Sequence, residues 1–233
     1  MKKIAIVLLI GLAASAWAQV PAATLRDFTG KVELKAPGGD WKVAVKGAKL
    51  DKNTAVSTGF KSTAVLVLGE SVLTVKPLTR LTLEEIVRQS GSDEVSLYLL
   101  AGRVRAEVKA PIGKTVKFSV KSPTATASVR GTGFDFDSVN VEVFEGLVEF
   151  LGSGGGPAVP VPAGLSSFVN ADGGATGALS AEEKTIAVLT VMGGMSEELF
   201  GVSPENFMDL LTTGGSGNLP PLPTVPGTIT IGW

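Results

Sequence analysis

The chain has 233 residues, with 21 lysine and arginine residues against 22 aspartate and glutamate residues, for a formal net charge of −1. This balance excludes the strongly basic surface on which nucleic-acid binding depends. The chain contains no histidine and no cysteine, which excludes Ser–His–Asp triads, Cys–His dyads, disulfide frameworks and zinc sites built from those ligands. We therefore expect no nucleic-acid partner, no cofactor, no metal and no enzymatic activity.

The N-terminus is typical of a secretory signal peptide. Lys2 and Lys3 precede a short apolar run, and the sequence Ala-Trp-Ala at 16–18 forms an A-x-A cleavage site. The pattern predicts a signal peptide over residues 1–18, cleavage before Gln19, and a periplasmic or secreted protein. Beyond this segment we find no run of about 18 apolar residues, so we expect no transmembrane segment after cleavage.

Between residues 24 and 151 the chain is a series of short segments in which apolar and polar residues alternate. This alternation is the pattern of strands that are buried on one face. The predicted strands cover residues 30–34, 41–45, 54–58, 64–68, 72–75, 95–99, 104–108, 116–120, 134–137, 139–143 and 147–151. Many short strands separated by glycine-rich turns predict an all-β roll or sandwich.

Residues 81–89 fit both a short helix and a strand. Leu81 and Leu83 alternate with a threonine, which favours a strand, but the charged residues that follow interrupt the alternation. We expect a strand that ends at Glu84 or Glu85 and is followed by a mobile loop over residues 89–93.

Residues 128–150 contain a turn marked by glycines and two alternating strands. Phe134 and Phe136 fall on one face of the first strand, and Asp135 and Asp137 fall on the other, because side chains alternate along a strand. We expect the phenylalanines to point one way, into the core, and the aspartates to form a solvated face.

The composition changes after residue 151, where Gly- and Ser-rich residues form a linker or a long hairpin loop. It leads to an edge strand around Val159 and Val161, each next to a proline. Further on, Ser180 and Glu183 have the spacing of a capping box, which predicts a helix that runs to about residue 192.

A second short helix is predicted from Ser203 to Leu211, with a proline at its first helical position. A Pro- and Gly-rich tail follows, and its last residues, 228–233, alternate like a strand. We interpret residues 19–170 as the β domain, residues 171–211 as a short helical appendage and residues 212–233 as the tail.

Basic side chains gather on the two strands around residues 103–121. We expect these strands to be neighbours, so that their outward cations share one face: Arg103, Arg105, Lys109, Lys117 and Lys121. Such a face is a candidate surface for an anionic envelope polymer or an acidic partner. The alternative is that exposed lysines protect the strands from edge-to-edge aggregation.

Three further sets of residues have both a functional and a structural interpretation. Arg130 either contacts a ligand or clamps a nearby group such as Glu145, and the clamp is favoured. Asp135 and Asp137, with an asparagine nearby, supply too few oxygen ligands for calcium. Trp41 and Tyr98 could stack on sugars, although a tryptophan in a strand is more often a core residue.

Several motifs recur in a recognisable order along these strands. The most specific are Val129-Arg130-Gly131-Thr132 followed by Phe134, and Glu145-Gly146 followed by Val148. With weaker features that begin near Trp41, they resemble the FecR-like periplasmic domain over about residues 25–170. The resemblance implies an all-β extracytoplasmic module that binds a protein or an envelope polymer.

The best-known members of that family transmit an iron-siderophore signal from an outer-membrane receptor to a cytoplasmic sigma factor. Our main interpretation is a non-enzymatic exported envelope protein with a FecR-like domain. One alternative is a component of sigma-factor and iron-transport signalling, and another is a structural or surface-assembly protein of the envelope. A third, drawn from the residues, is a carboxylate-only hydrolase in which Asp135 and Asp137 face a partner acid across a cleft.

Overall fold

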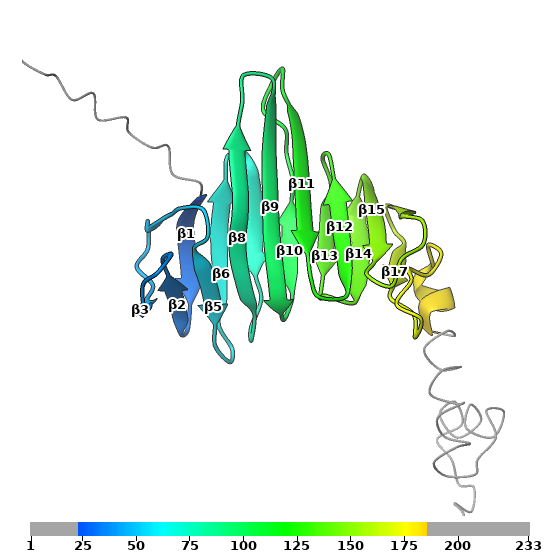
Figure 1. Cartoon of the computed structure of the whole chain (residues 1–233), viewed down its shortest axis with the longest axis horizontal. Helices are drawn as coiled ribbons and strands as arrows, with labels where there is room; N and C mark the ends of the chain where they lie inside the picture. The colour runs from blue at the N-terminus through cyan, green and yellow to red at the C-terminus, as the bar shows by residue number, and fades with distance from the viewer. Residues whose placement is uncertain (1–22, 186–233) are drawn as a thin grey trace, which may run out of the picture.

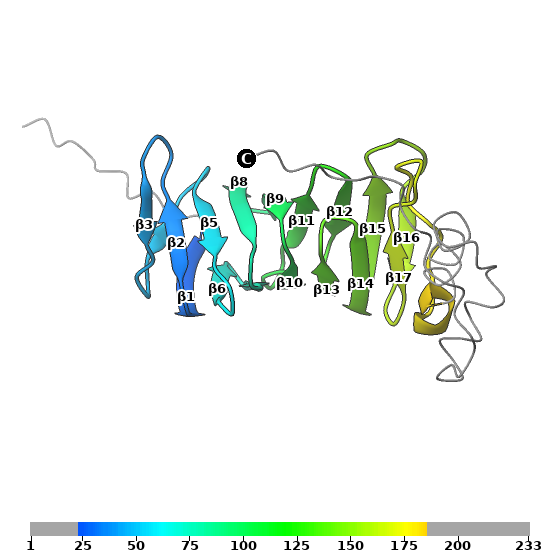
Figure 2. The same cartoon turned by 90° about the horizontal axis from the view of Figure 1, so that it is seen from below.

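The structure is a computed structural model that describes residues 23–185. Over those residues 17 strands form two β-sheets that lie face to face as two layers (Figure 2). The prediction of an all-β architecture of many short strands is confirmed.

The first sheet, sheet A, has eight strands, and the second, sheet B, has nine. The spatial order of sheet A is β17 (Ser166–Phe168), β14 (Asn140–Glu145), β13 (Gly133–Phe136), β10 (Val104–Glu107), β7 (Ser71–Val75), β6 (Thr63–Leu68), β1 (Ala23–Thr29) and β4 (Lys49–Leu50). The spatial order of sheet B is β16 (Val159–Pro162), β15 (Leu147–Gly152), β12 (Ala125–Val129), β11 (Thr115–Lys121), β9 (Ser92–Ala101), β8 (Arg80–Arg88), β5 (Ala55–Thr58), β2 (Val32–Lys35) and β3 (Trp41–Val43).

The chain passes repeatedly from one sheet to the other as it advances along the long axis of the molecule (Figure 1). The path through β9, β10 and β11 shows how this works. β10 lies in sheet A, so β11 returns to sheet B beside β9 and runs parallel to it. Parallel neighbours require such a crossover, whereas the antiparallel pairs can be joined by tight turns.

The core lies between the two sheets and follows the alternation of the strands. On β6, Ala64, Leu66 and Leu68 are buried while the residues between them are only partly buried. Two edge-to-face aromatic pairs join the layers, with ring centroids 6.5 Å apart for Phe118 and Phe134 and 6.2 Å apart for Phe136 and Phe150. The prediction that Phe134 and Phe136 point inward is confirmed.

β8 is longer than predicted, and the expected loop over residues 89–93 is wrong. The strand continues to Arg88, and β9 begins after a short turn, at Ser92. The pairing between β8 and β9 shifts between Leu83 and Glu85, as in a β-bulge. The extra residue changes which side chains of β8 face inward, so the next residue that packs against the core after Leu83 is Ile86. The alternation of buried and outward residues is therefore interrupted at this point of the sequence.

Among β1 to β15, three strands, β1, β4 and β12, lie outside the predicted ranges, and one residue expected in the core is exposed. β1 precedes the first predicted strand and carries a register shift between Leu25 and Asp27, while β12 consists of small residues with weak strand signals. Trp41 is not a core residue: it lies on β3, the last strand of sheet B, and is 37% exposed.

The C-terminal part of the described chain closes the far end of the molecule. β16 is an edge strand, as expected of a segment with two prolines. Isolated bridges join Ser166 to Leu179 and Val169 to Ala175. The predicted capping box is confirmed, because the Ser180 N–H donates to Glu183 Oε2 at 2.7 Å and the Glu183 N–H donates to Ser180 Oγ at 3.2 Å.

The helix that follows this capping box begins at residue 181. Four predictions lie outside the described residues: the signal peptide over residues 1–18, the remainder of the first helix, the second helix and the tail.

Candidate functional site

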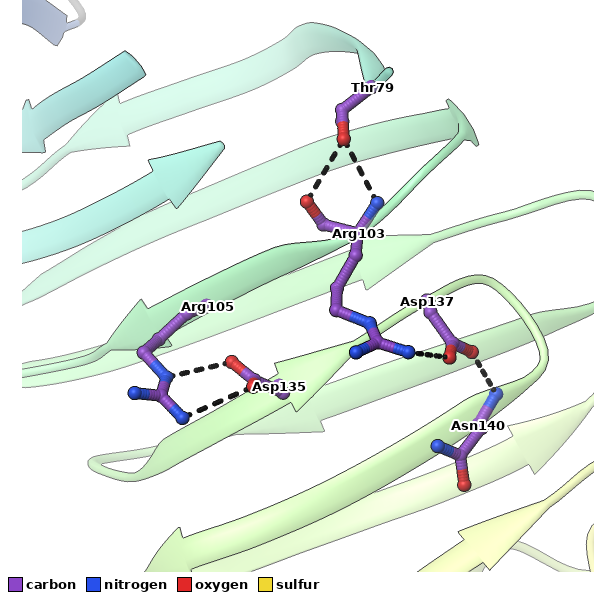
Figure 3. Close-up of polar contacts among 6 residues, drawn as sticks. All are labelled: Thr79, Arg103, Arg105, Asp135, Asp137 and Asn140. Carbon is purple, nitrogen blue, oxygen red and sulfur yellow. Dashed lines mark hydrogen bonds and ion pairs between the residues drawn. The ribbon is translucent and has the colours of Figure 1, made fainter. Parts of the chain in front are cut away.

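The outer face of sheet A carries two arginine–aspartate pairs (Figure 3). Arg105 on β10 lies directly opposite Asp135 on β13, and its Nε and Nη2 donate to Oδ1 and Oδ2 at 2.9 and 3.2 Å. Its guanidinium carbon also lies 4.4 Å from the centroid of the Phe144 ring. The hydrogen bond to Asp135 raises the pKa of Arg105 above its ordinary value.

The second pair is tied to two turns. Arg103 Nη2 donates to Asp137 Oδ2 at 2.8 Å, and Asp137 Oδ1 accepts the backbone N–H of Asn140 at 2.9 Å (Figure 3). The Thr79 hydroxyl accepts the N–H of Arg103 at 3.0 Å and donates to its carbonyl at 3.1 Å. The side chain and backbone of Arg103 therefore join the β13–β14 turn to the turn before β8.

These contacts assign a structural role to both aspartates. A carboxylate-only hydrolase needs a carboxylic acid that can donate a proton to the substrate, facing a second acid across a cleft. Here Asp135 and Asp137 each accept hydrogen bonds from a guanidinium on the neighbouring strand. Both carboxylates are therefore occupied by contacts that hold strands and turns together.

The expectation that five cations share one face is wrong. Arg105 lies on β10 in sheet A and Arg103 directly precedes that strand, whereas Lys117 and Lys121 lie on β11 in sheet B. The chain crosses between the layers after Glu107, so strands that are adjacent in sequence have outward side chains on opposite faces of the molecule. Lys109 falls in this crossing, where its N–H donates to Ser71 Oγ at 3.1 Å.

A groove of about 740 Å³ lies on the outer face of sheet B. It crosses β8, β9, β11, β12 and β15 and includes the turn that follows β12. Two cations of the predicted basic face, Lys117 and Lys121, line it together with Arg130. The structure thus brings together residues of one strand, β11, and of the turn that follows β12.

The floor of the groove is a row of serines. Ser96 on β9 is paired with Ser119 on β11, which is paired with Ser128 on β12, which is paired with Glu149 on β15. Paired residues on adjacent strands lie about 5 Å apart, so the row crosses the strands as a line of short hydroxyl side chains. Among the described residues, Ser128 makes no side-chain hydrogen bond, and Ser119 makes one of 3.5 Å to the Val95 carbonyl.

The cations stand on both sides of this row. Lys117 and Lys121 lie two residues before and two residues after Ser119, and both point outward because the intervening residues are buried. Arg130 follows Val129, which is paired with Phe118. Arg130 therefore lies at the level of Lys117, on the same side of the row.

These cations form no ion pair with any other residue between 23 and 185. Glu94 is the direct neighbour of Lys117 on β9, but the two do not form an ion pair. The expected clamp between Arg130 and Glu145 is also absent from this part of the chain, because Glu145 lies on β14 in sheet A, opposite Gly133. At one end of the groove, Glu85 is paired with Lys52 at 3.2 Å.

The prediction from sequence missed the serine row and the three glutamates of the groove, Glu85, Glu94 and Glu149. Each serine occupies an outward position in a predicted or observed strand, where a short polar residue is unremarkable. Their alignment follows from which strands are neighbours, and three of those strands are brought together by the crossover through β10.

The two candidate sugar-stacking rings lie apart, since β2, β5 and β8 separate Trp41 on β3 from Tyr98 on β9. The Arg80 guanidinium carbon lies 5.5 Å from the centroid of the Trp41 ring.

Between residues 23 and 185 we find no cluster of three or more acidic side chains placed to hold a metal ion. In the same range, no helix has the length and apolarity needed to cross a bilayer.

Residues 54–149 match the family model described as FecR protein, and this span includes every groove residue named above. No curated protein matches the chain. Two crystal structures of a "putative anti-sigma factor" from Parabacteroides distasonis ATCC 8503 are similar to it, each with 17% identity and a TM-score of 0.44.

The two matches cover 58% and 61% of this chain and 64% and 72% of those proteins. The chain therefore spans less than two thirds of the first of these structures.

Proposed function

We propose that this chain, which carries a FecR domain over residues 54–149, is an exported, non-enzymatic component of cell-surface signalling that acts by binding a protein partner. The observation that carries the proposal is the family match, because the best-known FecR proteins relay a signal between an outer-membrane receptor and a sigma factor. The groove on sheet B lies within the matched span and supplies a surface for the partner.

Binding is a better account of this surface than catalysis. The chain has no histidine or cysteine to act as a general base or nucleophile at neutral pH. The paired aspartates of sheet A are neutralised by arginines, and they lie on the face opposite the groove. The groove presents charged side chains and short hydroxyl side chains, which can bind a partner through ion pairs and hydrogen bonds.

Export is supported by the N-terminal residues. The positive start at Lys2 and Lys3, the apolar run and the Ala-Trp-Ala site at 16–18 are the three parts of a signal peptide. Intact mass spectrometry of the protein in the periplasmic and culture fractions tests this part of the proposal. We expect a mature chain that begins at Gln19, and an uncleaved chain found in the cytoplasm would contradict it.

The signalling role is tested by transcription. Deletion of the gene in its native bacterium should change the RNA levels of a coherent group of genes that share one sigma-factor promoter. Complementation with the wild-type gene should restore these levels, whereas the groove variant Lys117→Glu/Arg130→Glu, present at the same level in the envelope, should not. Unchanged transcription after deletion, under iron limitation and in replete medium, would overturn the proposal.

A further inference from the structure

We infer that the groove on sheet B binds an extended acidic segment of a protein, with carboxylates that contact Lys117, Arg130 and Lys121. The inference rests on the proposed function for the partner being a protein. The charges and hydroxyls of the groove indicate the chemical class of this partner segment.

The first observation is the placement of two like charges side by side. Phe118 and Val129 are paired on antiparallel strands, and Lys117 precedes Phe118 while Arg130 follows Val129. Lys117 and Arg130 are therefore neighbours on adjacent chain segments. Both line the groove, and both are exposed. Like charges at such positions repel one another. Within the described chain no ion pair offsets this repulsion, and a carboxylate between the two side chains would do so.

The second observation is the third cation across the serine row. Lys121 lies four residues from Lys117 on the same strand, or roughly 13 Å at the rise of a β-strand. The serine row passes between the two lysines, about midway, at Ser119. The groove therefore has positive charge on both sides of its floor, while Glu85 and Glu149 lie at the two ends of the serine row, next to Ser96 and Ser128.

An extended peptide that lies along the serine row fits this charge distribution when its acidic residues lie over Ser119, between the cations and two strands away from each of the two glutamates. Successive side chains of an extended peptide point in opposite directions. Two adjacent acidic residues would therefore reach opposite sides of the groove, one toward Lys117 and Arg130 and the next toward Lys121. The short hydroxyls of Ser119 and Ser128 leave room for the peptide backbone and can donate hydrogen bonds to its carbonyls.

The lining favours a peptide over a carboxylated sugar polymer. The aromatic residue of the lining, Phe118, is only 2% exposed, and the two rings considered for sugar stacking are not part of the groove. Tyr98 is the neighbour of Lys121 on β9 but does not line the groove, so a sugar ring over the serine row would have no aromatic face to stack on. A peptide needs only charge partners and hydrogen-bonding groups, which the groove supplies.

The inference is tested with a synthetic probe and the mature full-length protein. The probe is a fluorescein-labelled peptide, Gly-Thr-Glu-Glu-Glu-Glu-Thr-Gly, and the matched peptide has glutamine in place of each glutamate. Fluorescence anisotropy should show binding of the glutamate peptide at low salt, weaker binding at higher salt, and at least a tenfold lower affinity for the glutamine peptide. Lys117→Glu/Arg130→Glu should reduce the affinity for the glutamate peptide at least tenfold.

The control variant is Lys42→Glu/Lys49→Glu. It makes the same change in net charge at exposed residues of β3 and β4, outside the groove. Its affinity for the glutamate peptide should stay within about twofold of wild type. Thermal unfolding of both variants confirms that each is folded before binding is compared. An equal loss of affinity in the two variants would show that net charge alone attracts the peptide, and would overturn the inference.

A second arm distinguishes the polymer from the peptide. Polygalacturonate, a carboxylated polysaccharide, is titrated under the same conditions. If it binds through Lys117 and Arg130 and the glutamate peptide does not, the inference is wrong. If no peptide binds but the groove variant still alters transcription, the acidic-segment assignment fails while the proposed function stands. If the peptide binds through the groove and deletion leaves transcription unchanged, the proposed function fails and the binding site stands.

Discussion

Arg105 shows how a single side chain on sheet A is held by two partners. Its guanidinium forms two hydrogen bonds with the Asp135 carboxylate and lies against the Phe144 ring, so its polar edge and its flat face are both in contact. A bidentate arrangement suits arginine in a way that lysine cannot reproduce. The side chain remains 42% exposed, however, so solvent screens the ion pair.

We expect Arg105→Ala to lower the free energy of unfolding by about 1 kcal/mol, since an exposed ion pair and an exposed cation–π contact each contribute less than that. Urea denaturation monitored by circular dichroism measures the change. Lys121→Ala, which removes an exposed cation that has no ion pair in the described chain, should change stability by about 0.5 kcal/mol or less. Equal effects of the two substitutions would contradict the role assigned to the Asp135 pair.

Glu183 provides a pH-dependent contact at the start of the C-terminal helix. The hydrogen bonds from the backbone and side chain of Ser180 lower the pKa of this carboxyl. Because the folded-state pKa is depressed, the cap is fully formed above the unfolded-state pKa, about 4.3, and is lost as the pH falls through the folded-state value. An NMR titration should give a midpoint for Glu183 below about 4.3 that rises toward that value in Ser180→Ala. An unchanged midpoint in the variant would contradict the capping assignment.

At the scale of the strands, the tight turn between β9 and β10 depends on Gly102. This glycine has a φ of +94°, and a Cβ placed there would overlap the Thr79 side chain and backbone. Thr79 is the residue that holds the backbone of Arg103. Gly113, in the connection from β10 to β11, has a φ of +74° but has nothing within 4 Å of such a Cβ.

The two glycines form a matched pair for a stability test. Gly113→Ala should cost only the backbone penalty of a left-handed residue, about 1 kcal/mol. Gly102→Ala adds a steric clash with a buried turn and should cost roughly 3 kcal/mol or more. Thermal and urea unfolding of both variants compare the two costs. The account of the turn is wrong if Gly102→Ala is no more destabilising than Gly113→Ala.

The strands show which parts of the fold can be predicted from sequence. Alternation locates most of them, and it places Phe134 and Phe136 correctly because every second residue faces the core. It fails at β8, where a bulge after Leu83 changes the inward set without ending the strand. A change of phase and the end of a strand look the same in a sequence, and only the pairing with β9 separates them.

The candidate site was predicted in part for a related reason. Lys117 and Lys121 are predicted as outward cations and do line one groove, together with Arg130, for which the sequence favours a clamp. The same prediction wrongly includes Arg103 and Arg105, which lie on the other face of the molecule. The alternation of apolar and polar residues predicts which side chains point away from the core, but it does not predict which of the two sheets a strand belongs to. That assignment depends on the crossover between β10 and β11, which has no signature in the residues themselves.

At the scale of the whole molecule, the core is continuous from the first strands to the last. Leu25, Val32 and Leu50 are fully buried, although all three precede Thr54, where the family match begins. β1 is paired with β6 and β2 with β5, so the first four strands cover one end of both sheets. The matched span is therefore shorter than the unit that folds.

We expect a fragment of residues 54–149 to show no cooperative unfolding transition, because it lacks the strands that cover β5 and β6 and cuts β15 before its end. The mature chain from Gln19 should unfold in a single steep transition for its β domain. Far-UV circular dichroism on heating makes the comparison. A fragment that melts as steeply as the mature chain, and at the same temperature, would show that the matched span folds alone.

The progression of the chain along the long axis also has a mechanical consequence. The strands run across that axis, and the two ends of the described chain, at residues 23 and 185, lie at opposite ends of the molecule (Figure 1). Hydrogen bonds between strands therefore point along the line that joins these ends. Tension applied between the ends would load the bonds of one strand pair at a time and peel the sheets open from an end, instead of shearing many bonds at once. A module built this way yields gradually when it is pulled, and its aligned serine row would remain intact until the outer strands had separated.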